Sequence, residues 1–81
     1  MKVCVRLFAA ARQQVGQDRV SVELPEAATV ADLRRGLAEQ YPALQDRVAH
    51  LLFAVDRQYA TDDMSLVADA EIAGFPPVSG G

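Results

Sequence analysis

The chain has 81 residues, of which 51% are apolar and 23% charged, so we expect one small domain with a single core. Its formal net charge of -3 argues against nucleic acid or an anionic membrane as the main partner. No apolar stretch approaches the roughly 20 residues of a membrane span. The N-terminus lacks a signal-peptide layout, so we expect a cytoplasmic protein. The single cysteine, Cys4, is interpreted as a small core or sheet residue in a reducing compartment.

The first 24 residues predict two strands joined by a short helix. Residues 2–8 alternate in polarity, which is typical of a half-buried strand. "AAARQQVG" is rich in helix formers and is closed by Gly16, which tolerates the left-handed conformation that ends a helix. "RVSVEL" alternates again before Pro25. We therefore expect a wide hairpin with a helical turn in its connection. One side of its first strand presents Val3, Val5 and Leu7, and the other presents Cys4, Arg6 and Phe8.

The stretch "TVADLRRGLAEQYP" predicts the main helix. Thr29 and Asp32 have the spacing of a capping box, and Pro42 ends the pattern. Gly36 in the interior is unfavourable in an exposed helix, so we expect a close approach to the sheet there. The apolar stripe at helical spacing consists of Val30, Leu33, Leu37 and Tyr41. Arginines off this stripe are expected on solvated faces, namely Arg34 and Arg35.

The second half of the chain predicts two more strands. "LLFAV" at 51–55 is apolar throughout, as in a central strand that is covered on both sides or has one face at an interface. The polar "DRQYATDD" is predicted to form a turn, and "EIAGF" at 71–75 is predicted to form the last strand. Pro76 and Pro77 cannot donate to a ladder, so the sheet should end at Phe75. The order predicts an α+β fold, with a mixed sheet on one main helix and short extra helical turns. If the first and last strands pair side by side in parallel, the sheet wraps around that helix.

Residues 1–75 are thus predicted to form the domain and residues 76–81 an extended tail. The two prolines hold an extended course, and the tail reaches roughly 20 Å. Glycines without a Cβ can pass a narrow channel and bring the carboxylate of Gly81 to a buried centre. A carboxylate is a poor electrophile, so it needs activation, most simply by ATP to an acyl-adenylate. A sulfur nucleophile could then leave a thiocarboxylate. The tail consists of Pro76, Pro77, Val78, Ser79, Gly80 and Gly81.

Two stretches carry a resemblance to a known family. "LFAAAR" is similar to a Phe-Ala-x-x-Arg exit from the first strand, and "EIAGFPPVSGG" is similar to an ending Glu-Val-Ala-x-x-Pro-Pro-Val-Ser-Gly-Gly. The chain resembles, from end to end, the sulfur-carrier (MoaD/ThiS) family of ubiquitin-like β-grasp proteins, and within it most closely the small subunits of molybdopterin synthase. Asp69 stands where that family usually has glycine, and Asp56 where it often has asparagine.

The resemblance implies a non-catalytic carrier with no bound cofactor. An E1-like (MoeB-like) enzyme would use ATP to adenylate Gly81, and a sulfur donor would convert the adenylate to the thiocarboxylate. The tail would then enter a MoaE-like large subunit. That subunit supplies the catalytic side chains and passes the sulfur to cyclic pyranopterin monophosphate during molybdenum cofactor biosynthesis.

Residues outside the tail point to a binding surface more than to catalysis. Phe75 and Phe8 are candidate partner-binding aromatics, because a small sheet with one helix leaves a face uncovered. Core packing is the alternative for both. His50 has no Cys or His at ligand spacing, so we expect no metal site. Two functions remain open besides the implied one. The first is a sulfur carrier for thiamin thiazole, a sulfur amino acid or tRNA, and the second is a plain interaction module.

Overall fold

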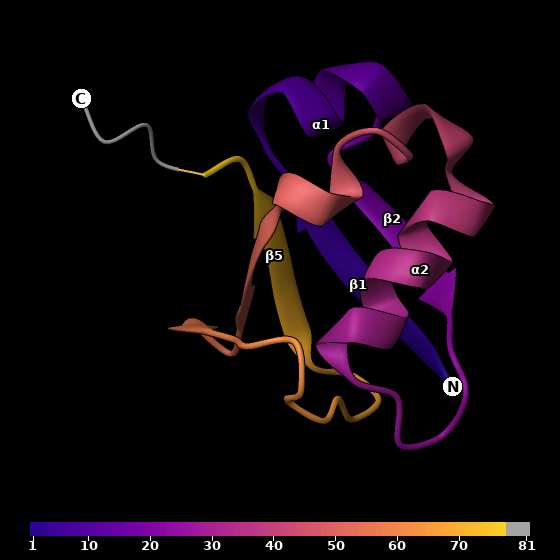
Figure 1. Cartoon of the computed structure of the whole chain (residues 1–81), viewed down its shortest axis with the longest axis vertical. Coiled ribbons are helices and arrows are strands. Elements are labelled where there is room, and N and C mark those ends of the chain that lie inside the picture. Colours follow the sequence, from indigo (N-terminus) through magenta and orange to yellow (C-terminus); the bar gives the residue numbers. More distant parts are fainter. Residues whose placement is uncertain (78–81) are drawn as a thin grey trace.

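The structure, a computed structural model, describes residues 1–77. These residues form one five-stranded sheet in the order β2-β1-β5-β3-β4. Figure 1 shows α2 lying across one side of this sheet. The predicted α+β fold is confirmed. Its elements are β1 (Lys2–Leu7), α1 (Ala9–Val15), β2 (Arg19–Glu23), α2 (Val30–Gln40), η1 (Pro42–Leu44), η2 (Val48–His50), β3 (Leu52–Val55), β4 (Gln58–Tyr59) and β5 (Glu71–Phe75), where η1 and η2 are short 3₁₀ helices.

The strand pairing contains the predicted wide hairpin and meets the condition for a sheet wrapped around α2. β1 and β2 are antiparallel with α1 in their connection, and Gly16 ends α1 with a positive φ of 81°. β1 and β5, the first and last strands, are parallel neighbours. β3 pairs antiparallel with β5. The middle strand of the sheet is therefore β5, which places the exit of the tail at the centre of the sheet.

The main helix begins where the capping box predicts. The backbone N–H of Thr29 donates to Asp32 Oδ2 at 2.9 Å, and the backbone N–H of Asp32 donates to Thr29 Oγ1 at 3.4 Å. The bond from the Thr29 backbone stabilises the charged form of Asp32, and the Thr29 hydroxyl and the Arg35 guanidinium add to it. Together they hold the pKa of Asp32 below its ordinary value of 3.8. The helix start is thus fixed by two residues three apart in the sequence.

Gly36 lies at a close approach of α2 to β2 and to Leu24 just after it. A Cβ on this residue would lie 2.9 Å from Val22 Cγ1 and 3.0 Å from Leu24 Cδ2. Both distances are shorter than ordinary carbon contacts, so any side chain there would push the helix away from the sheet. The close approach predicted from the sequence is confirmed.

One hydrophobic core lies between α2 and the covered face of the sheet. The inward residues of β1, β2, β3 and β5 alternate with exposed or half-buried ones. This alternation agrees with the period of two in the sequence. The largest fully buried side chains are Phe53, Leu7, Leu33, Leu37, Leu44, Val3, Val5, Val20, Val22 and Val30.

The structure corrects one local expectation and decides between the stated alternatives in two others. The apolar strand at 51–55 is covered on one face only, because Leu52 and Ala54 stay half-exposed. The polar stretch after it is more than a turn, since Gln58 and Tyr59 form β4 against β3. Cys4 lies in the sheet but outside the core, because even-numbered residues of β1 face solvent. In each case the face of the strand, which depends on what packs against it, decided the outcome.

Candidate functional site

The tail leaves the domain at Phe75, the last residue of β5. Phe75 lies opposite Leu52 of β3, and Gly74 before it faces the core. A Cβ on Gly74 would lie 3.0 Å from Cε1 of Phe53, so β5 sits tightly on the core just before the tail. Pro76 and Pro77 follow outside the sheet, and both are exposed. The start of the tail is thus anchored on a central, closely packed strand.

The rest of the predicted tail site lies outside the described residues. This applies to Val78, Ser79, Gly80 and Gly81, whose roles stay predictions. Within residues 76–77, Pro76 and Pro77 help to line a small groove of about 350 Å³. Its other walls come from α1, from η2 and from the residues on either side of η2, namely Ala10, Ala11, Gln14, Asp46, Arg47, His50 and Leu51. The domain surface next to the tail is therefore built from two short helices.

The side of the sheet opposite α2 carries no helix or strand among residues 1–77, and we call it the open face. The strand pairings bring Phe8 and Phe75 to the same end of this face, beside Leu52. Phe8 is 37% exposed and Phe75 is half-buried. The structure therefore brings together the two aromatics that the sequence selected, next to the start of the tail. The open face consists of Lys2, Cys4 and Arg6 on β1, Phe8 just after β1, Arg19, Ser21 and Glu23 on β2, Leu52 and Ala54 on β3, Tyr59 on β4, and Glu71, Ala73 and Phe75 on β5.

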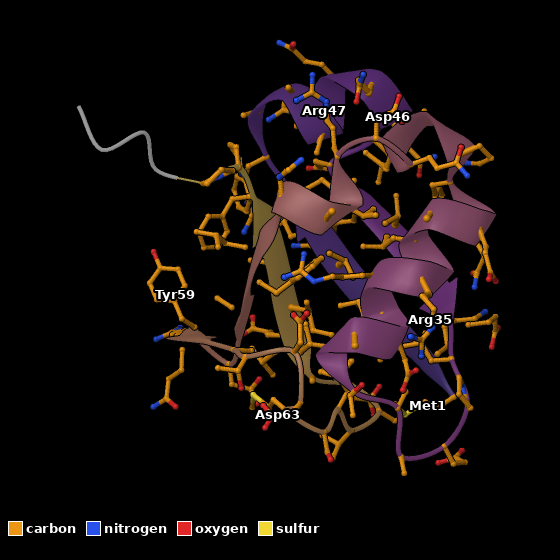
Figure 2. All side chains as sticks on the ribbon, in the orientation of Figure 1. Met1, Arg35, Asp46, Arg47, Tyr59 and Asp63 are labelled. Atoms are coloured by element: carbon orange, nitrogen blue, oxygen red, sulfur yellow. The ribbon has the colours of Figure 1, made fainter. Side chains whose placement is uncertain are left out.

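Tyr59 is an aromatic of this face that sequence reasoning missed. It pairs with Ala54 across β3 and β4, and its ring meets that of Phe75 edge-on, with centroids 5.6 Å apart. The side chain is 69% exposed and points away from the body of the domain in Figure 2. An apolar strand followed by a short turn and then an aromatic residue is typical of a β-hairpin. This pattern, from Leu52 to Tyr59, could have predicted the position of Tyr59.

Arg34 has a different role from the one expected of it. Its Nη1 donates to the backbone oxygens of Val48 and Leu51, and its Nε pairs with Asp62 Oδ1 at 3.0 Å. The guanidinium also lies 4.9 Å from the centre of the Phe53 ring. With a side chain 19% exposed, Arg34 joins α2 to the segment before β3 and is not a solvated surface charge. Arg35, 69% exposed, fits the expectation.

The two departures from the family pattern occupy left-handed backbone positions. Asp69 has φ 68° and Asp56 has φ 49°. Aspartate tolerates this region better than most residues, so both turns form. Asp56 also caps the last strand, because its Oδ1 accepts from the backbone N–H of Glu71 at 3.1 Å. Its carboxylate therefore has a structural role at the start of β5.

Catalytic and membrane features are sparse in the described part of the chain. Within residues 1–77, no group of three or more His, Cys, Asp or Glu side chains could hold a metal ion, and His50 stands in η2. No helix there is long and apolar enough to cross a membrane. Within residues 1–77, the arrangement offers an open face whose apolar part lies beside the start of the tail.

Comparison with known proteins decides the family. The model of the ThiS family matches residues 5–81. The chain belongs to the ThiS family. The curated relative "Molybdopterin synthase sulfur carrier subunit" of Caenorhabditis elegans is 37% identical over 83 aligned residues, covering 100% of this chain and 99% of the relative. A protein of the same name from Dictyostelium discoideum is 34% identical over 80 residues, covering 95% and 93%.

The likeness extends to solved structures. SAMP1, the small archaeal modifier protein 1 of Haloferax volcanii, matches this ThiS-family chain with a TM-score of 0.87 and 31% identity over 100% of both chains. The ubiquitin-like β-grasp fold that the sequence predicted is thereby confirmed. Both the fold and the full-length match to named sulfur carriers agree with the resemblance seen in the two sequence motifs.

Proposed function

We propose that this ThiS-family chain is the sulfur carrier subunit of a molybdopterin synthase. The observation that carries the proposal is the exit of a "PPVSGG" tail from the central strand of a domain similar, over its full length, to proteins of that name. The domain holds the tail and presents it to other proteins. The reacting group is the carboxylate of Gly81.

The proposed chemistry takes place on that carboxylate. An E1-like enzyme supplies ATP, and a carboxylate oxygen attacks its α-phosphate, which releases pyrophosphate and leaves an acyl-adenylate. A donor that delivers sulfur at the oxidation level of sulfide then attacks the acyl carbon and expels AMP. One sulfur atom replaces one oxygen, with no change of oxidation state. In the synthase, the thiocarboxylate passes its sulfur to cyclic pyranopterin monophosphate. The carboxylate is regenerated with an oxygen from water.

The apolar part of the open face is the proposed contact with the large subunit. Phe8, Tyr59 and Phe75 are partly or largely exposed and lie beside the start of the tail. Aromatic side chains contribute most to protein interfaces when a partner excludes water from them. Binding there would hold the tail in one direction as it enters the partner. In this arrangement the large subunit supplies the catalytic side chains.

Mass spectrometry of the full chain tests the carrier chemistry. After incubation with the activating enzyme of the same organism, ATP and a sulfur donor, we expect a gain of about 16 Da from sulfur replacing oxygen. The chain lacking Gly80 and Gly81 is the matched control, because it keeps the domain and loses the reacting group. An unchanged mass in the complete chain, with enzymes active on another carrier, would contradict the proposal.

The name of the archaeal relative supports a second candidate, a protein modifier. An activated carboxylate at Gly81 can acylate an amine as well as a sulfur atom, and the domain matches that modifier with a TM-score of 0.87. The same spectrum separates the two functions. A carrier gains one sulfur, whereas a modifier becomes linked by an amide to a second protein.

Co-purification tests the other sulfur pathways. Recovery of a thiazole synthase or a tRNA-thiolating enzyme with the chain would indicate one of those pathways instead.

A further inference from the structure

The charges of the open face differ in sign from those of the whole protein. A groove of about 700 Å³ crosses this face over β2, β1 and β5. Four basic and two acidic side chains line it, a local charge of +2, although the chain as a whole carries -3. The charged lining consists of Lys2, Arg6, Arg19, Arg57, Asp69 and Glu71. The acidic excess therefore lies elsewhere on the molecule.

Two arginines of the groove oppose each other across the β1–β2 ladder. Arg6 and Arg19 are register partners, and both are exposed. Like charges placed directly opposite on antiparallel strands are destabilising. Within residues 1–77, neither forms an ion pair, whereas Lys2, Arg34 and Arg35 all pair with carboxylates of the chain. The sheet thus holds two cations together without a counter-charge from residues 1–77.

The arginine pair is continuous with the apolar part of the open face. The guanidinium of Arg6 lies 5.5 Å from the centre of the Phe8 ring. Across the sheet, Arg6 is in register with Ala73, which is in register with Ala54 and then Tyr59. One partner surface that covers Phe8 and Tyr59 therefore also reaches Arg6 and Arg19.

We propose that Arg6 and Arg19 bind carboxylate side chains of the protein that covers the apolar part of the open face. The inference rests on the proposed function, because it takes that protein to be the synthase large subunit. Paired arginines present guanidinium groups that suit bidentate contacts to carboxylates. The acidic occupant neutralises the two opposed charges and fixes the direction in which the partner lies across the strands. It also speeds association, because opposite charges steer the encounter.

The rate of association with the large subunit of the same organism tests the proposal. The variant Arg6→Gln/Arg19→Gln has a net charge of -5, and so has the control Arg12→Gln/Arg35→Gln, whose exposed sites lie off the open face and away from the groove beside the tail. At low salt we expect the first variant to associate roughly tenfold more slowly than the wild type, and the control within about twofold. The difference should shrink in about 0.5 M salt because ions screen exposed charges. Thermal unfolding of each variant checks that the domain remains folded.

A cross-linking arm identifies the occupant. The variant Arg6→Lys/Arg19→Lys keeps both charges and should restore association, and a carbodiimide should join the introduced amines to Asp or Glu of the large subunit. Equal rates for the two charge-matched variants, or cross-linked complexes without such bonds, would overturn the proposal while leaving the carrier function intact. Failure of the wild type to bind the large subunit would overturn both this docking and the partner in the proposed function.

Discussion

The two faces of the sheet differ in how their polar groups are satisfied. On the covered face, apolar side chains are buried under α2, and the one arginine that reaches over them, Arg34, donates to two backbone oxygens and to a carboxylate. On the open face, aromatic rings lie next to the opposed pair Arg6 and Arg19. The covered face provides the stability of the domain. The open face carries groups for which we propose partners on another protein.

The two edges of the sheet show the same contrast. At the β2 edge, the side-chain amide of Gln40 accepts from the backbone N–H of Glu23 at 3.0 Å and donates to its carbonyl at 2.9 Å. The Tyr41 hydroxyl donates to the carbonyl of Ser21 at 2.8 Å. The end of α2 thus occupies backbone groups that an added strand would need. The β4 edge, by contrast, consists of only two residues, Gln58 and Tyr59, and both are exposed.

The largest expected effect comes from breaking the covered face. Phe53 is 1% exposed, and its ring lies under the Arg34 guanidinium and close to Gly74. Phe53→Ala should therefore lower the free energy of unfolding by about 3–5 kcal/mol. Tyr59→Ala, on the open face, should lower it by less than about 1 kcal/mol. Urea unfolding followed by circular dichroism measures both. Similar losses at the two sites would show that the open face is part of the core.

A smaller effect separates two neighbouring arginines of α2. Arg34→Ala leaves the carbonyls of Val48 and Leu51 without their donor, and we expect a loss of about 2–3 kcal/mol in the free energy of unfolding. Arg35→Ala removes only an exposed ion pair with Asp32, so its loss should stay below about 1 kcal/mol. The same unfolding experiment compares them. Equal losses would assign Arg34 to the solvated surface.

The smallest effect concerns the start of α2 and depends on pH. The folded-state pKa of Asp32 lies below 3.8, so its charge stabilises the folded chain at pH values above 3.8. That contribution disappears as the pH falls through the folded-state pKa. Asp32→Asn should therefore be less stable than the wild type at pH 7, and the two should converge below pH 3.8. Thermal unfolding of both proteins between pH 7 and 2.5 measures the difference in stability. A difference that stays constant over this range would show that Asp32 does not contribute to the pH dependence of stability.

The sequence by itself determined most of the elements and the point where the sheet ends. Alternation placed β1, β2 and β5 within one residue of their bounds, because a half-buried strand must repeat every two residues. Thr29 and Asp32 marked the start of α2 through bonds between residues three apart. Pro76 marked the end of the sheet, since proline has no N–H to donate. These signals are local, and local geometry decides them.

Tertiary structure alone decided which residues meet. The opposition of Arg6 and Arg19 depends on the register of β1 with β2, and the contact of Tyr59 with Phe75 on two successive pairings through β3. The carbonyl partners of Arg34 lie 14 and 17 residues away along the chain. Such contacts form only when buried surface brings distant segments together. A strand's sequence gives the spacing of its side chains but does not name the neighbours that pack beside them.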